Sequence, residues 1–324
     1  MREAYFIQQN KEKWLSIESK LSPKSRLDAS TLTQLYLDIS EDLSFAETFY
    51  PKSETYVYLN GLAANAHTKI YSNKKESKNK LWRFYSYEFP LQFKKYHKEL
   101  LLAFSVFLLF SIIGAYSSAV DPDFSRLILG DAYVNKTLEN IENDDPMAIY
   151  KDANQTDMFL GITINNIRVG LTSFSLGILF GLGSLMIAIQ NAIMLGSFQY
   201  FFYQQGLLWE SVRTIWIHGT IEISVIIVCI CSGLVIGKSM LFPGTYTRLQ
   251  AFVDGVKNAL KIVISTIPFF IIAGALEGYV TRYTQMPDWL AISIILVSLA
   301  LILYYYVFLP IKLNKQNQLL ETND

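Results

Sequence analysis

The chain has 324 residues, of which 51% are hydrophobic, and its 28 lysines and arginines balance its 28 aspartates and glutamates. A net charge of zero says nothing about binding to nucleic acid, so the local distribution of charge is the informative quantity, and no nucleic-acid partner is predicted. The apolar residues are unevenly spread: residues 1–98 are polar and charged, and residues 99–310 carry nearly all the long apolar runs. This split predicts a membrane protein with a separate polar domain.

Apolar residues between positions 32 and 49 recur at three- and four-residue spacing, which predicts an amphipathic helix. Ser30 is a candidate N-cap for this helix, and Ser53 is one for a further helix that runs to Ile70. We therefore predict that residues 2–73 form a small helical hairpin or bundle.

Residues 74–98 combine aromatic and basic side chains: Leu81, Trp82, Phe84, Tyr85, Tyr87, Phe89, Phe93 and Tyr96, with Lys74, Lys75, Lys78, Lys80, Arg83, Lys94, Lys95 and Lys98. Such a mixture can bind nucleic acid, but here it leads directly into an apolar span. We therefore predict an amphipathic segment that lies on the inner membrane surface, against anionic lipids. It would close a cytoplasmic domain of residues 1–98.

Six apolar stretches are expected to cross a hydrocarbon core of about 30 Å. They cover residues 100–120, 167–189, 192–203, 213–237, 261–280 and 289–309. A polar break at Gln190-Asn191 is expected to end the second, and the short third could be re-entrant instead. The acidic loop at 121–163 is expected to hold one or two short helices, around 124–142 and 146–160.

Basic residues precede the first span and follow the fourth and sixth, whereas the 121–163 loop is acidic. The positive-inside rule then places both termini in the cytoplasm and the loop outside. The sequence thus predicts an all-α polytopic protein of the cytoplasmic (inner) membrane. Its parts would be the domain at 1–98, a six-span domain at 99–310 and a cytoplasmic tail at 311–324.

His218 and Glu222 lie four residues apart near the start of the fourth span, on one helix face. A carboxylate inside a bilayer costs roughly 2.5–3.5 kcal/mol, so this face must contact other helices or a wet cavity. Span order brings further polar residues to the same outer depth. The predicted intramembrane polar cluster consists of Asn165, Asn166, Arg168, His218, Glu222 and Glu277.

Two interpretations of this cluster remain open. It could be a structural network that pins three helices, with Glu222 or Glu277 paired to Arg168 or His218. It could also be an ion, proton or small-ligand site open to the outside. One histidine and two carboxylates are familiar zinc ligands, but the HGxxE spacing lacks the second histidine of the metalloprotease HExxH motif. The metal question is left undetermined, and no catalytic residue and no cofactor are predicted.

Glycines at four-residue spacing let helix backbones approach closely in lipid. Three such pairs predict tight packing among spans two, four and five: Gly177 and Gly181, Gly233 and Gly237, and Gly274 and Gly278. Pro268 is expected to kink span five, because it removes the hydrogen bond to the Ile264 carbonyl. Span six has no glycine between Trp289 and Leu309, and we expect it to be peripheral or to form a homo-oligomer contact.

Several motifs follow one another in order: Asn165-Asn166 heading a span, Gly177 to Gly181, Asn191 with Gly196, His218-Gly219-x-x-Glu222, and Ile267-Pro268-Phe269-Phe270 followed by Ala275-Leu276-Glu277-Gly278. In this order they resemble the stage II sporulation protein M family over roughly residues 99–310. The added N-terminal domain and Gln190-Asn191-Ala192, where the family commonly has Asn-Gly, depart from its pattern. In endospore formers the family member is a membrane component of a complex that degrades septal peptidoglycan during engulfment. It recruits two extracytoplasmic partners and is not known as a hydrolase.

The resemblance implies a non-enzymatic membrane scaffold for a cell-envelope complex. Its expected partners are membrane lipids and other envelope proteins, the latter through the 121–163 loop and the cytoplasmic domain. The alternative is a transporter or channel that uses His218, Glu222 and Glu277. A transporter needs a continuous polar path to the inside, where Asn191 is the only strongly polar residue that the sequence suggests.

Overall fold

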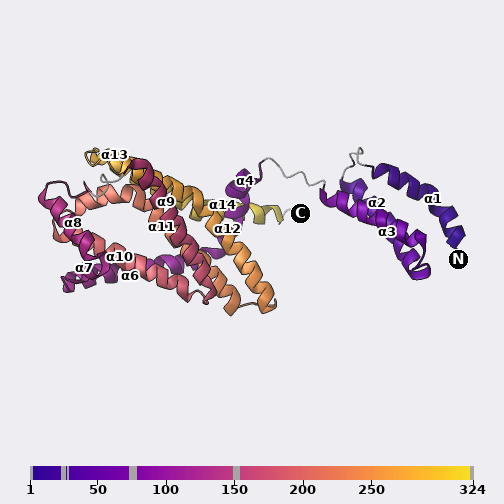
Figure 1. The fold of residues 1–324 in the computed structure, drawn as a ribbon, viewed down its shortest axis with the longest axis horizontal. Helices are drawn as coiled ribbons and strands as arrows, with labels where there is room; N and C mark the ends of the chain where they lie inside the picture. Colours follow the sequence, from indigo (N-terminus) through magenta and orange to yellow (C-terminus); the bar gives the residue numbers. More distant parts are fainter. Residues whose placement is uncertain (1–2, 23–26, 28, 73–78, 149–153, 322–324) are drawn as a thin grey trace. The chain divides into compact units, whose positions relative to one another are not determined.

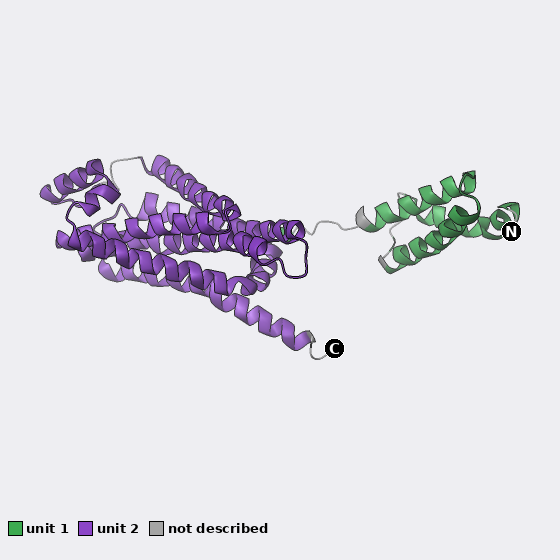
Figure 2. Cartoon of the chain, turned by 90° about the horizontal axis from the view of Figure 1, so that it is seen from below, with its two compact units in different colours: residues 1–80 green, residues 81–324 purple. Residues whose placement is uncertain are grey.

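The computed structural model describes residues 3–22, 27, 29–72, 79–148 and 154–321. Within these residues the protein is helical and contains no β-strand. The chain forms two compact units, residues 1–80 and residues 81–324, which are coloured separately in Figure 2 and described separately here.

Unit 1 is a bundle of three helices, α1 (Glu3–Lys20), α2 (Ala29–Phe49) and α3 (Glu54–Ser72). Its core is built from residues at helical spacing on each helix, among them Phe6, Trp14, Ile39, Leu59 and Ala66. Ser53 caps α3, since its hydroxyl accepts a hydrogen bond from the Tyr56 amide at 3.2 Å. Ser30, in contrast, lies inside α2.

Unit 2 begins with a nearly continuous helical stretch that includes two short irregular turns. Its parts are α4 (Lys80–Arg83), the π-helical η1 (Phe84–Glu88), α5 (Phe89–Phe93), the 3-10 turn η2 (Lys94–Tyr96) and α6 (His97–Val120). Phe89 and Phe93 are completely buried and pack against Tyr306 near the chain's other end.

The segment 74–98 was predicted to lie on the membrane surface, and for Phe89 and Phe93 the structure shows burial in the core of unit 2 instead, whereas Leu81, Trp82 and Tyr87 are exposed. Phe89 and Phe93 lie four residues apart on one helix face, and that face belongs to the core of unit 2. The boundary between the units lies at Lys80 rather than at Lys98. Lys74, Lys75 and Lys78 lie outside the described residues.

The acidic loop contains two short helices, α7 (Phe124–Leu129) and α8 (Asp131–Glu142), separated at Gly130, whose φ is +87°. Val134 and Met147 pack on Phe201 and Phe202 and form a small apolar cluster. The loop is thus folded onto the protein. Part of the second short helix expected here, at 146–160, falls on residues outside the described ranges.

The next two helices differ from the prediction. They are α9 (Gln155–Ser175), followed by the 3-10 turn η4 (Leu176–Ile178), and α10 (Leu182–Gln204). The chain reverses at Phe180 and Gly181, with φ of +54° and +81°, and not at Gln190-Asn191. Asn191 is accommodated inside α10, because its side-chain amide donates to the Ile187 carbonyl at 2.8 Å.

The remaining elements are α11 (Leu208–Leu241), α12 (Arg248–Ala275), the π-helical η5 (Leu276–Val280), α13 (Asp288–Leu303), the π-helical η6 (Tyr304–Phe308) and α14 (Leu309–Glu321). The centre of the bundle is α11, which contacts α6, α9, α10, α12 and α13 (Figure 1). Every residue from Val225 to Gly237 is buried, as expected for a helix surrounded by others.

Five helical stretches among the described residues are long and apolar enough to cross a membrane: Lys80–Val120, Leu182–Gln204, Leu208–Leu241, Arg248–Val280 and Asp288–Leu320. The sixth long helix of unit 2, α9, is not among them. It carries Asn165, Asn166 and Arg168 in its middle, which lowers its hydropathy.

Four glycines pack against one another where the η4 turn meets α11, and we call Gly177, Gly181, Gly233 and Gly237 the glycine seam. A Cβ on Gly177 would lie 2.6 Å from the Gly233 Cα, and one on Gly237 would lie 2.6 Å from the Phe180 carbonyl oxygen. Gly177 and Gly181 were expected to lie within one helix, but Gly177 lies in η4 and Gly181 forms the turn before α10. Near the other end of α9, Gly274 approaches Thr163, and Gly278 approaches Phe159.

Pro268 lies inside α12, which continues through it to Ala275. The proline leaves the Ile264 carbonyl without its usual helical partner. The hydroxyl of Tyr85, from η1, donates to that carbonyl at 3.0 Å. Tyr305, from η6, in turn donates to the Tyr85 carbonyl at 3.0 Å. Two irregular turns thus meet α12 at its proline.

Candidate functional site

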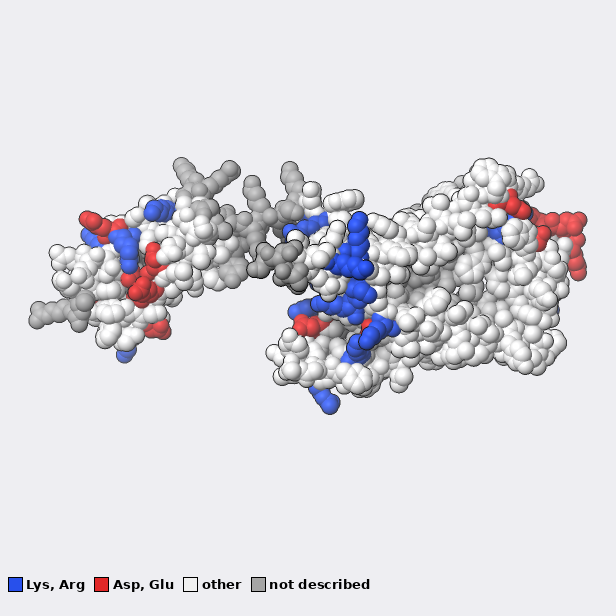
Figure 3. Space-filling view, turned by 180° about the vertical axis from the view of Figure 1, so that it is seen from behind, with Lys and Arg blue, Asp and Glu red and all other residues white. Residues whose placement is uncertain are grey.

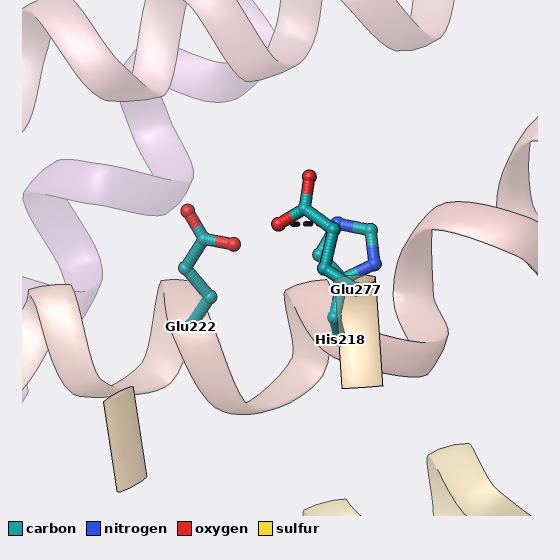
Figure 4. Close-up of side chains that lie close together, drawn as sticks. All are labelled: His218, Glu222 and Glu277. Atoms are coloured by element: carbon teal, nitrogen blue, oxygen red, sulfur yellow. Dashed lines mark ion pairs between the residues drawn. The ribbon is translucent and has the colours of Figure 1, made fainter. Parts of the chain in front are cut away.

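The candidate site is formed by His218 and Glu222 of α11 and by Glu277 of η5, which we call the His–Glu cluster. One ligand atom from each side chain lies within 4.8 Å of the others. Figure 4 shows the three side chains converging, with Glu222 one helical turn from His218 on α11. The His218 Nε2 lies 3.7 Å from a Glu277 carboxylate oxygen.

The orientation of the His218 ring is set by Thr281. The Thr281 hydroxyl donates to the Leu276 carbonyl at 3.2 Å, and it lies 3.0 Å from the His218 Nδ1. Because that hydroxyl proton is already used, we assign the Nδ1 as the donor to the Thr281 oxygen. The neutral ring then presents the lone pair of Nε2 to Glu277 and to the space between the carboxylates.

That space is part of a cavity of about 540 Å³. Side chains from α6 to α11 line it, and Ile128, Leu129 and Tyr133 of the acidic loop border it. Asn166 of α9 also lines it and is only 4% exposed, yet its amide Nδ2 has no hydrogen-bond partner among the described residues. The cavity therefore contains an imidazole, two carboxylates and an unpaired amide donor.

The predicted site residues divide into two groups. Asn166, His218, Glu222 and Glu277 line the cavity together, and Asn165 lines it although its side chain is largely exposed. Arg168 is exposed and is not among the residues that line the cavity. Two residues along a helix correspond to a rotation of about 200°, so Arg168 points away from the face that carries Asn166.

Among the residues that the structure describes, no lysine or arginine lines the cavity beside the cluster. Among the described residues, an ion pair within the cluster joins Glu277 to His218, and a histidine is charged only when it is protonated. Two carboxylates inside a helix bundle are stable when they are protonated or when they share a cation. The cluster is thus suited to bind protons or a metal ion.

The bundle is tightly packed where η4 meets α11. The glycine seam joins η4 and α11 there, and the Ser184 hydroxyl donates to the Ser173 carbonyl at 2.6 Å. Asn191, expected to lie deep on the inner side, lines the cavity instead. It reaches the cavity because α10 begins at Leu182, so that Asn191 lies in the middle of the helix.

Two polar features were not recognised from the sequence. Thr281 follows η5, and no periodicity marks it as the partner of His218. Glu99 is 7% exposed and forms an ion pair with Lys238, which joins α6 to the C-terminal end of α11. A lone acid next to the start of an apolar run was the available signal for Glu99, since such a residue requires a partner.

An all-helical unit with five membrane-length helices and a polar cluster in its interior defines a multi-pass membrane protein. The profile described as stage II sporulation protein M matches residues 103–282, and the chain belongs to that family, as its motifs suggested. A profile described as a domain of unknown function (DUF8413) matches residues 4–72, which lie in unit 1.

A curated relative is the uncharacterized protein MJ0706 of Methanocaldococcus jannaschii. It is 24% identical over 188 residues, which cover 57% of this chain and 82% of the relative. No solved structure matches the chain.

Proposed function

We propose that the protein is a non-enzymatic scaffold in the cytoplasmic membrane, with both termini inside, that assembles a cell-envelope complex. Membership of the stage II sporulation protein M family supports the membrane part of this proposal. In this view unit 1 and the acidic loop carry the contacts to partner proteins on opposite sides of the membrane. The exposed α13, whose few buried residues are Ala291, Ser298 and Ile302, would contact lipid or a second copy.

The distribution of charge supports the proposed orientation. Figure 3 shows the lysines and arginines of unit 2 gathered mainly at one end, and the aspartates and glutamates at the other. The basic residues are Lys94, Lys95, Lys98, Lys238, Arg248, Lys257, Lys261, Lys312 and Lys315, and the acids of the loop are Asp121, Asp123, Asp131, Glu139, Glu142, Asp144 and Asp145. Basic residues favour the cytoplasmic side, so the acidic loop and the mouth of the cavity would face outwards.

A sixth span is part of the proposal. The polar residues of α9 face the cavity or the acidic side, and its small residues follow α11 and α12 from Thr163 against Gly274 to Gly177 against Gly233. A helix that accompanies two membrane spans over this length would itself cross most of the bilayer. Its polar residues are tolerated because they line a cavity or lie near the outer surface.

The observation that favours a scaffold over a transporter is the glycine seam. A transporter requires a polar path from the cavity to the inner end of the bundle. On that side the backbones of Gly177 and Gly233 lie too close together to admit even a methyl group. The cavity would support the transporter alternative only if the glycine seam opened a path to the other end of the bundle.

Site-specific cross-linking in the native membrane tests the scaffold role. A photoreactive residue would replace Asn143 in the acidic loop, exposed Val57 in unit 1, or Leu109, which is 54% exposed on α6. A scaffold is expected to capture one partner set from Asn143 and another from Val57, while Leu109 captures lipid. Equal, unspecific cross-linked products at all three positions, together with solute flux across proteoliposome membranes, would contradict the scaffold role and favour a transporter.

A further inference from the structure

We propose that the His–Glu cluster binds a divalent transition-metal ion, with Zn²⁺ the expected ion, through His218, Glu222 and Glu277. The inference is independent of the scaffold proposal, because it concerns a ligand of the isolated protein. It rests on the convergence of three donors and on the absence of a lysine or arginine among the described residues that line their cavity.

The donor set fits such an ion. A histidine nitrogen and two carboxylate oxygens are ligands that Zn²⁺ accepts at about 2.0–2.2 Å. The imidazole disfavours Mg²⁺ and Ca²⁺, which prefer oxygen ligands alone, and the lack of sulfur disfavours Cu(I). Cys229 and Cys231 are the free cysteines, and neither lines the cavity.

The charges fit as well. A neutral imidazole and two carboxylates carry a total charge of −2, which one divalent ion neutralises. Arg168 points away from the cluster, and Figure 3 shows the lysines and arginines of unit 2 gathered mainly at one end. In the bundle interior a metal ion would therefore supply the positive charge that no lysine or arginine among the described residues lining the cavity supplies.

The geometry needs little adjustment. Ligands around a tetrahedral zinc ion lie about 3.4 Å apart, so donors within 4.8 Å of one another must approach by at most about 1.4 Å. Carboxylate rotations into the cavity supply such a movement. Thr281 already accepts from the His218 Nδ1, which directs Nε2 towards Glu277, as the second-shell partner of a metal-binding histidine does.

Three protein ligands leave one coordination position open to the cavity. Asn166 is buried at the same cavity, and its Nδ2 can donate a hydrogen bond to a water molecule or an anion bound at that position.

The test uses the full-length protein, purified in detergent, stripped with a chelator and reloaded with Zn²⁺ or Mn²⁺ alone. Bound metal is measured by elemental mass spectrometry after desalting, and thermal stability is measured with and without metal. We expect one Zn²⁺ per chain and a higher Tm in the wild type. Glu222→Gln, Glu277→Gln and His218→Gln should lose both effects, whereas Asp157→Asn, an exposed carboxylate on α9, should retain both.

Thr281→Val tests the positioning residue. It removes no metal ligand, and the loss of a second-shell partner should weaken Zn²⁺ binding roughly 10- to 100-fold while the stoichiometry at saturation stays at one. A merely structural threonine would lower the Tm of the metal-free protein and leave the affinity unchanged.

Two results would overturn the proposal. One is a wild-type protein that binds neither ion and shows no rise in Tm, which would leave the cluster as a proton-binding or structural network. The other is full metal binding by Glu222→Gln and Glu277→Gln. If a variant fails to fold, X-ray absorption of the zinc-loaded wild type decides: only nitrogen and oxygen ligands are expected, and a sulfur ligand would assign the ion to cysteine.

Discussion

Glu222 and His218 occupy one face of α11, and the neighbouring carboxylate of Glu277 comes from a different element. Glu222→Gln keeps the shape and most hydrogen-bonding capacity of the side chain, so the metal-free protein should lose little stability. Glu222→Leu would remove the carboxyl group from the cavity that Asn166 also lines, leaving that buried amide without this polar neighbour, and should cost roughly 1–3 kcal/mol. Unfolding of the two variants in detergent, measured without metal, gives the comparison. A larger loss for Gln than for Leu would contradict it.

Adding a single methyl group at Gly233 tests how tightly the glycine seam is packed. A Cβ there would overlap the Ser184 hydroxyl and lie 2.7 Å from the Ser173 carbonyl oxygen. Gly233→Ala should therefore destabilise the protein by about 1–3 kcal/mol, as overpacking does. Gly219→Ala is the control on the same helix, because its nearest neighbours would lie at 3.7 Å or more. If both variants unfold at the same temperature, the seam is not tightly packed.

The contact between η1 and α12 joins two whole elements. Pro268 leaves the Ile264 carbonyl of α12 without a backbone donor, and the Tyr85 hydroxyl of η1 donates to it instead. Tyr85→Phe removes the hydroxyl that donates to the Ile264 carbonyl, and should cost about 1–3 kcal/mol by leaving that half-buried acceptor unpaired. In a Pro268→Ala background the new backbone amide at this position can donate instead, so the same change should cost less. A double-mutant cycle of unfolding free energies measures the coupling. Additive effects would show that Tyr85 does not compensate for the proline, and Tyr87→Phe, at an exposed position, serves as control.

Helical periodicity was sufficient to predict much of the bundle and part of the site. It placed His218 and Glu222 on one face, and span order brought Glu277 to the same depth. Periodicity could not locate the reversal at Gly181, because the polar Asn191 satisfies its amide within its own helix. It also could not show that Phe89 and Phe93 pack on Tyr306, since an aromatic face suits a lipid surface as well as a protein core.

At the scale of the whole molecule, each unit has its own apolar core. Trp14 of unit 1 donates to Asp42 at 2.7 Å, and Asp42 also pairs with Lys13 at 2.5 Å. Unit 2 is organised around α11, with Glu99 and Lys238 joined at its basic end. This division agrees with the separate profiles that match residues 4–72 and residues 103–282.

The orientation of unit 2 decides which compartment the cavity faces, and it can be tested by cysteine labelling in intact cells. Cys229 and Cys231 are buried, so the background should be low. Cysteine at Asn143, exposed after α8, should react with a membrane-impermeant maleimide from outside. Cysteine at Gln316, exposed on α14, or at Ser72, should react only after permeabilisation, because the basic end of unit 2 favours the cytoplasm. The reverse pattern would turn the acidic loop and the His–Glu cluster towards the cytoplasm, and the metal would then be drawn from inside the cell.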